Sequence, residues 1–222
     1  TYRNNSPDTL AYLWIQLDQN LFRKDSDTRL TQTAPRLPLP PPPPAGAPIP
    51  GAARPVPRLP FEGFDMLMTA LDFDGGYHIT SVTDAKGGPL PHTIVKTMMR
   101  IDLPQPLAPQ ASVVFNIAWD YNIHDGKTMP VRGGYEHFPK DGNDIFTISQ
   151  WYPRLAAYTD VNGWQHKQYL GAGEFTLEFG DFLVRITAPE DHVVAASGVL
   201  QNPEQVLTKT QRDRLASART AK

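Results

Sequence analysis

The segment from Ser112 to Tyr121 carries the clearest structural signal in the sequence. Every second position in it is apolar: Val113, Phe115, Ile117, Trp119 and Tyr121. Polar residues such as Asn116 and Asp120 occupy the alternate positions. Successive side chains point to opposite faces in a β-strand, so this period of two predicts a strand with one buried face. The segment therefore favours a β-rich fold.

Further segments of strand character are separated by clusters of Pro, Gly, Asn and Asp. Such clusters favour turns, because Asn and Asp bond their own backbone and Pro presets φ. We predict additional strands over residues 10–17, 77–82, 92–103, 175–179, 182–187 and 193–199. Short strands with regular turns between them predict an all-β fold, namely a large antiparallel β-sandwich.

A proline tract interrupts this pattern between Pro35 and Pro60. Twelve of the 23 prolines lie there, including the run from Pro40 to Pro44. Proline has no backbone N–H and favours extended polyproline II, so the tract is predicted to lie outside the sheets. A solvated inserted loop is favoured over a docking segment for a proline-recognition domain, because composition alone is weak evidence for a partner.

The last segment changes character and predicts a helix over residues 203–219. Asn202 is a suitable N-cap, and Pro203 suits the first helical position. The apolar stripe of this helix is thin. We therefore assign residues 1–202 to one β-sandwich domain, with 35–60 as an insertion, and residues 203–222 to a helical linker.

Composition excludes several functional classes. The formal net charge of −2 argues against a nucleic-acid partner, which requires a clustered basic surface. There is no cysteine, so disulfides and thiolate metal sites are excluded. No apolar run approaches the roughly 18 residues needed to span a bilayer.

Motifs for metal or nucleophilic chemistry are not found. None of the six histidines is followed by Glu and no two are four apart, so the H-E-x-x-H zinc motif is absent. The stretch Asp120–Gly126 resembles a calcium loop but has Val131 where a bidentate Glu is required, so a turn is favoured. We therefore predict no catalytic residue, no metal ligand and no cofactor in this chain.

Aromatic side chains concentrate in one part of the sequence: Trp151, Tyr152, Tyr158, Trp164 and Tyr169. They could form a platform for a ligand. Packing within the core and turns of a β domain is the favoured interpretation, because such domains use aromatic residues freely.

The stretch Thr147–Arg154 is the most recognisable part of the sequence. Together with Gly163–Trp164, Gly173–Phe175 and Thr187–Gly198, it resembles the N-terminal domain of aminopeptidase N-like zinc metallopeptidases, the gluzincins. Tyr2–Leu10 resembles the first long hairpin of that family. The chain departs from the family's Pro-x-x-Asp-x-Pro pattern, because Asp160 is followed by Val161 and Asn162 and the second proline is missing.

The resemblance implies a curved, saddle-like β-sandwich that packs on a thermolysin-like catalytic domain. Zinc is then expected in that other domain, beyond the present chain, and the partners are that domain and the N-terminus of a peptide substrate. The sequence starts at Thr1 rather than Met, so we expect the true N-terminus, with any export signal that it carries, to lie upstream. The location is not determined by the sequence, and a periplasmic or secreted one is favoured.

Gln150 is the one substrate-binding residue that the resemblance implies. Ser149 and Trp151 flank it on a predicted strand, so alternation sends both neighbours to the opposite face. The family role is contact with the substrate near its free α-amino group. We also expect an apolar patch near Trp151 and Tyr152, where a catalytic domain would dock.

Two other functions remain open. The chain could be a free-standing β-sandwich module that binds a peptide or carbohydrate through its aromatic cluster, or a purely structural fragment. An H-E-x-x-H motif in the reading frame beyond Lys222 would exclude the free-standing module.

Overall fold

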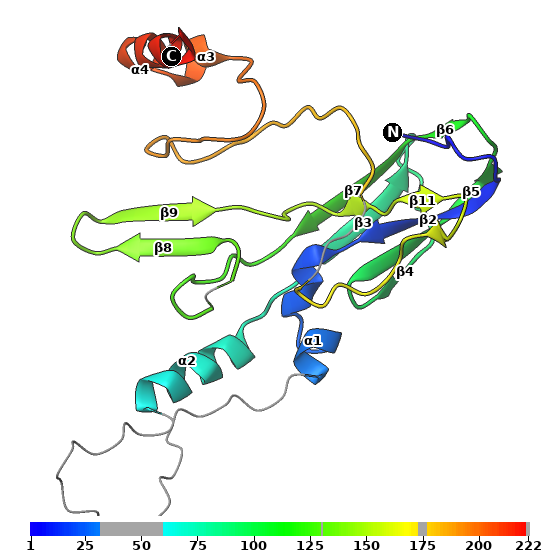
Figure 1. Cartoon of the computed structure of the whole chain (residues 1–222), viewed down its shortest axis with the longest axis horizontal. Helices are drawn as coiled ribbons and strands as arrows, with labels where there is room; N and C mark the ends of the chain where they lie inside the picture. The colour runs from blue at the N-terminus through cyan, green and yellow to red at the C-terminus, as the bar shows by residue number, and fades with distance from the viewer. Residues whose placement is uncertain (32–59, 130, 173–176, 221–222) are drawn as a thin grey trace, which may run out of the picture. The chain divides into compact units, whose positions relative to one another are not determined.

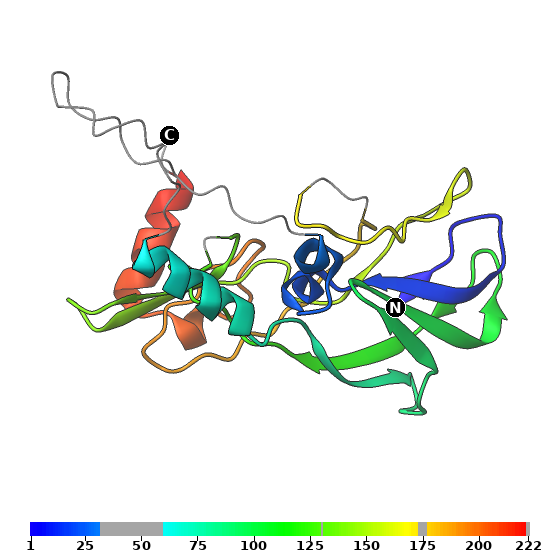
Figure 2. The ribbon, with the colours of Figure 1, turned by 90° about the horizontal axis from the view of Figure 1, so that it is seen from below.

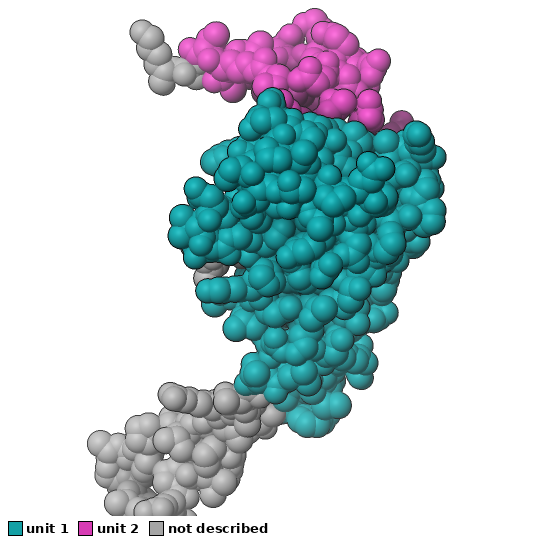
Figure 3. All heavy atoms as spheres, turned by 90° about the vertical axis from the view of Figure 1, so that its right-hand side faces the viewer, with its two compact units in different colours: residues 1–179 teal, residues 180–222 magenta. Residues whose placement is uncertain are grey.

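The computed structural model describes residues 1–31, 60–129, 131–172 and 177–220. It divides into two compact units, residues 1–179 and residues 180–222 (Figure 3). The predicted proline tract falls almost entirely on residues 32–59, outside the described residues.

A four-stranded antiparallel sheet forms the centre of the first unit. Its order is β10 (Arg154–Leu155), β2 (Leu10–Gln16), β5 (Met98–Leu107) and β4 (His92–Val95) (Figure 1). The predicted strand over 92–103 is thus two strands. Lys96, between them, takes a left-handed φ of 54°, and Val95 pairs with Met98. Lys96 and Thr97 are not among the Gly, Pro, Asn and Asp residues that mark turns, so the sequence did not show the reversal.

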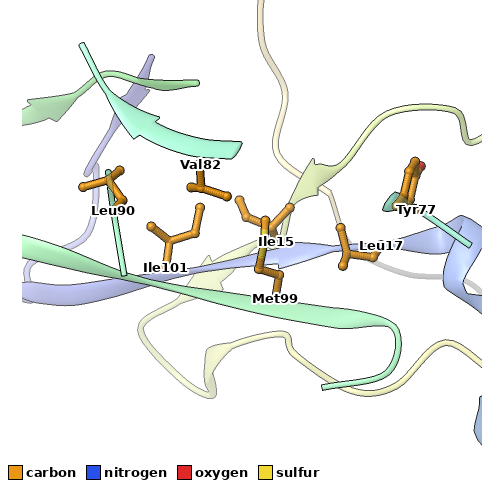
Figure 4. Packing of buried hydrophobic residues seen from close by; sticks show 7 residues of the cluster. All are labelled: Ile15, Leu17, Tyr77, Val82, Leu90, Met99 and Ile101. Carbon is orange, nitrogen blue, oxygen red and sulfur yellow. The ribbon is translucent and has the colours of Figure 1, made fainter. Parts of the chain in front are cut away.

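A second antiparallel pair, β3 (His78–Asp84) and β7 (Phe115–Asp120), covers one face of that sheet. The alternating residues of β7 are half-buried and exposed in turn, as the period of two predicted. One core cluster joins side chains from these strands and their flanks: Ile15, Leu17, Tyr77, Val82, Leu90, Met99 and Ile101 (Figure 4). Full burial of an Ile or Leu side chain stabilises a fold by about 1.5–3 kcal/mol. The all-β, antiparallel prediction is confirmed.

A second core cluster packs against residues of two short strand pairs. They are β1 (Tyr2–Arg3) with β6 (Ser112–Val113), and β11 (Tyr158–Thr159) with β12 (Gly163–Trp164). Trp164 is 7% exposed and stacks edge-on against Tyr158 at 5.2 Å between ring centroids. Because its indole ring is buried, Trp164 is not part of a surface platform for a ligand.

An antiparallel hairpin of β8 (Gly134–Phe138) and β9 (Asn143–Thr147) pairs with no other strand in the described part of the chain. Figures 1 and 2 both show it extending away from the sheets of the core. Apolar side chains on it remain exposed, including Ile145 at 55%. The sequence analysis did not predict this hairpin.

Three helical segments of the first unit were also not predicted from the sequence. They are the 3-10 helix η1 (Asp18–Phe22), α1 (Asp27–Leu30) and α2 (Phe61–Asp72). The Ser26 side chain caps α1 by accepting from the Arg29 N–H. Arg29 in turn donates to the carbonyls of Ala70 and Leu71 at the end of α2. Such contacts satisfy helix-terminal carbonyls that have no partner within the helix.

The second unit differs most from the sequence prediction. Residues 182–187 and 193–199 form no strand there, so these two predictions are wrong. Their apolar side chains are exposed, with Leu183 at 72%, and a strand requires a partner backbone to satisfy its N–H and C=O groups. Of the predicted strand 175–179, the structure describes residues 177–179, and among these only Leu177 pairs, in an isolated bridge with Ala156.

The predicted C-terminal helix is present as α3 (Pro203–Val206) and α4 (Lys209–Thr220). Asn202 precedes Pro203 as predicted, although its side chain makes no capping bond to the backbone. The break has a local cause: Gln211 accepts from the Thr208 N–H, and Thr208 Oγ1 accepts from the Gln211 N–H. This reciprocal capping box starts a new helix. No helix among the described residues is long and apolar enough to cross a membrane.

Candidate functional site

Gln150 lies in a bend after β9 rather than on a strand. Its φ is 49°, in the left-handed region that residues other than glycine seldom adopt. The strand alternation predicted for Ser149, Gln150 and Trp151 therefore does not apply, and that part of the prediction is wrong. The Gln150 residue is half-buried.

Two side chains fix the backbone of Gln150. Its carbonyl accepts a 2.9 Å hydrogen bond from the Tyr77 hydroxyl and a 3.1 Å bond from Gln19 Nε2. The same Gln19 nitrogen donates to the carbonyl of Ser149 at 3.1 Å. Tyr77 belongs to the main core cluster (Figure 4). The bend is thus tied directly to the core and to η1.

A buried ion pair lies next to this contact. Arg154 on β10 donates from Nε to Asp18 Oδ2 at 2.6 Å, and Gln16 Nε2 donates to Asp18 Oδ1 at 2.6 Å. Burial raises the pKa of the Asp18 carboxyl, and the Arg154 guanidinium and Gln16 amide offset part of that rise. Burial, followed by the nearby Asp18 charge, also raises the pKa of Tyr77. Both effects keep the Tyr77 hydroxyl protonated as a hydrogen-bond donor.

Trp151 and Tyr152 are both half-buried, so neither lies deep in the core. Their rings meet edge-on at 5.0 Å, and Trp119 donates from its indole N–H to the Trp151 carbonyl at 3.1 Å. The exposed apolar surface lies just upstream, at Ile148 and Phe146, which are 47% and 44% exposed. Because neither ring lies deep in the core, the apolar docking patch expected near Trp151 and Tyr152 stays a prediction.

Ser149 also lines a shallow hollow in the surface. Its volume is about 210 Å³, including space open to solvent. It is lined by Gln19, Tyr121, Ile123, His124, Arg132, Gly133, Gly134, Thr147, Ile148 and Ser149. The loop after β7, the start of β8 and the end of β9 thus supply its walls.

Two buried polar atoms in this hollow have no hydrogen-bond partner, His124 Nε2 and Ser149 Oγ. His124 is 4% exposed and packs against the rings of Phe22 and Phe73 at 5.1 and 6.2 Å. Burial lowers the pKa of His124, and the Gly133 backbone and the Asp125 charge counter only part of that effect. The ring is therefore neutral near pH 7.

Sequence reasoning missed this pair of side chains. His124 lies within the rejected calcium-loop stretch Asp120–Gly126, and Ser149 enters the sequence prediction only as a neighbour of Gln150. The Gly133-Gly134 dipeptide was the available signal, since paired glycines mark a close approach of the backbone to another group. Within the described ranges, no three His, Asp or Glu side chains group as a metal-ligand set.

Comparisons with known proteins do not assign the chain to a family. No family model matches the sequence, and neither a curated protein nor a solved structure is significantly similar to it.

Proposed function

We propose that this chain is the non-catalytic, substrate-side and scaffolding N-terminal domain of a larger zinc aminopeptidase-like protein. In this proposal the zinc and the catalytic groups belong to another domain of the same protein. The chain contributes Gln150, which contacts the free N-terminus of a peptide substrate. The conformation and anchoring of Gln150 carry the proposal.

A strained backbone conformation costs about 1–3 kcal/mol, so it persists only where the surrounding structure fixes it. Such conformations cluster at ligand-binding sites. Lys96 and Gln110 also have positive φ, but each belongs to a tight turn beside paired strands. Gln150 follows β9 outside any hairpin turn, and its carbonyl is held from both the core and η1. This anchoring supports a role in positioning the Gln150 side chain.

The chemistry of an amide suits the proposed contact. A Gln side-chain oxygen accepts a hydrogen bond from an ammonium group without adding a charge that must be desolvated. A hydrogen bond to a charged group contributes about 1.5–3 kcal/mol. The proposal thus requires only one well-placed amide from this chain.

The alternative, a free-standing module for a peptide or carbohydrate, loses support from the aromatic residues. Trp164 is buried in the second core cluster, and the Tyr158 hydroxyl is bonded to Asp8 at 2.6 Å. Trp151, Tyr152 and Tyr169 are the half-buried members left for a platform. Sequencing the frame downstream of Lys222 separates the two proposals, because an H-E-x-x-H motif there excludes a free-standing module.

The test uses the complete protein with Gln150→Ala and measures kcat/KM on peptides with a free amino terminus. Loss of the ammonium contact is expected to lower kcat/KM by roughly ten- to a hundredfold. Gln110→Ala is a matched control, because Gln110 also has a positive φ of 63° and is expected to leave kcat/KM unchanged. Wild-type kcat/KM in Gln150→Ala would overturn the proposal.

A further inference from the structure

We propose that helix α2 (Phe61–Asp72) is a docking face for a basic amphipathic helix of a partner protein. The partner helix has an apolar stripe flanked by lysine or arginine. This inference goes beyond the proposed function, since it concerns neither Gln150 nor a peptide substrate. The face lies within the first unit, on the helix labelled α2 in Figure 1.

Large apolar side chains form one stripe along α2. They follow one another at spacings of three, four and three residues, which are the a and d spacings of a heptad repeat. This spacing places side chains on one side of a helix and is typical of the seam between two paired helices. We call these residues the α2 seam: Phe61, Phe64, Met68 and Leu71.

The α2 seam is open to solvent. No residue of α2 is buried. Single exposed apolar side chains are ordinary on protein surfaces, whereas a continuous row of large ones marks an interaction site. The exposed fractions of the seam residues are 85% for Phe61, 47% for Phe64, 41% for Met68 and 44% for Leu71.

The helix is attached to the first unit at its C-terminal end. Arg29 donates hydrogen bonds to the carbonyls of Ala70 and Leu71 there. The half-buried residues of α2, namely Gly63, Leu67 and Ala70, form a stripe beside the seam rather than within it. A free helix of this length is marginal in water, so its attachment favours the helical state before a partner binds. A preformed helix loses less conformational entropy on binding.

The charges beside the α2 seam select the partner. Asp65 and Asp72 each follow a d residue of the seam, which places them at the e positions of the heptad. Glu62 adds a third negative charge, and α2 contains no Lys or Arg. Charged residues at e and g positions pair across helices and set partner choice. The partner helix is therefore expected to carry basic residues beside its own apolar stripe.

The same charges oppose two other occupants of the seam. Antiparallel pairing of α2 with a second copy would set Asp65 against Asp72, and like charges repel. A parallel pair would set Leu67 against Asp72, which adds no attraction between charges. An anionic membrane surface repels an acidic helix for the same reason.

The probe is a synthetic peptide of about three heptads, with Leu at its a and d positions and Lys at its e and g positions. Fluorescence anisotropy of the labelled peptide is followed as the whole chain is added at low ionic strength, where charge pairs are least screened. We expect saturable binding that is roughly five- to tenfold weaker in Met68→Ala. Met66→Ala is the matched control, because Met66 is 36% exposed on the same helix but lies outside the seam. It should keep the wild-type midpoint.

A charge reversal tests the choice of partner. The double variant Asp65→Lys with Asp72→Lys should prefer a peptide that carries Glu in place of Lys at the e and g positions. Wild type should prefer the Lys peptide. Equal binding of both peptides to wild type would overturn the proposal, and so would the absence of saturable binding or equal losses in Met66→Ala and Met68→Ala.

Two further results would assign the seam to another occupant and overturn the proposal. One is a dimer of the whole chain in sedimentation that Met68→Ala dissociates. The other is binding to vesicles of phosphatidylcholine and phosphatidylserine that Met68→Ala abolishes. Because Met68 is exposed, Met68→Ala should unfold at the wild-type urea midpoint, so its loss of binding is separable from loss of folding.

Discussion

The Tyr77 hydroxyl donates a 2.9 Å hydrogen bond to the carbonyl of Gln150, 73 positions further along the chain. Tyr77 is 2% exposed and belongs to the main core, whereas Gln150 is half-buried in a left-handed bend. This hydrogen bond therefore holds the bend in a fixed position against the core.

Tyr77→Phe removes this bond and keeps the ring in the core. The Gln150 carbonyl still accepts from Gln19, so the loss is limited to about 0.5–1.5 kcal/mol of unfolding free energy. Urea unfolding followed by tryptophan fluorescence should show a lower midpoint with an unchanged slope. Tyr135→Phe on the exposed hairpin is the control and should stay within about 0.5 kcal/mol of wild type. Equal midpoints for Tyr77→Phe and wild type would contradict the expectation.

Gln150→Gly should stabilise the isolated chain. A left-handed conformation costs an L-residue about 1–2 kcal/mol, and part of this gain is offset because glycine makes the unfolded chain more flexible. We expect a net rise in unfolding free energy of about 0.5–1 kcal/mol, and a fall for Gln150→Val, whose branched Cβ tolerates positive φ poorly. If Gln150→Val were the more stable variant, the bend would not have the conformation described.

Arg154→Met should be strongly destabilising, because it leaves the Asp18 carboxylate buried without its counter-ion. Breaking a buried ion pair by removing one partner typically costs about 3–5 kcal/mol. The Asp18 side chain is 1% exposed, whereas the Arg100–Asp102 pair has both side chains 44% exposed. Arg100→Met is therefore the matched control and should cost less than about 1 kcal/mol. Similar losses in both variants, measured by chemical unfolding, would show that burial of Asp18 does not decide the effect.

Protonation of His124 should destabilise the first unit. The folded pKa of His124 lies below its ordinary value of 6.5 because of burial, so the unfolded chain binds the proton first as pH falls. This stabilising contribution is complete above pH 6.5 and is lost as pH falls through that value towards the folded pKa. The unfolding free energy should therefore decline over this window.

The comparison that isolates His124 is His124→Gln against the exposed His92→Gln. The first variant should show less decline in unfolding free energy between pH 7.5 and pH 5.5, and the second should follow wild type. An identical pH dependence in His124→Gln and wild type would assign the decline to other groups.

Local pattern was sufficient for several elements. Alternation identified β7, because one of its faces lies on the core, and that one-sided burial is what a period of two records. Flanking turn residues marked β2 and β3. The helical character of the last segment was equally readable, since Pro203 and the good helix formers after it act through nearby residues. The gluzincin resemblance, the sandwich architecture and the role of Gln150 remain predictions.

The sequence could not show where a strand finds its partner. Residues 182–187 alternate as β7 does, yet they form no strand, whereas the β8–β9 hairpin forms with both faces largely exposed. Hydrogen-bond partners far along the chain decide such cases, and periodicity contains no information about them.

The site shows the same division most clearly. The sequence alone determined a β-rich chain without a zinc motif and pointed, through a resemblance, to Gln150. Only the tertiary structure decided that Gln150 occupies a left-handed bend, held by Tyr77 and Gln19, and that His124 and Ser149 line the same hollow. Those arrangements depend on contacts between residues far apart in sequence, and such contacts exist only once the sheets have packed.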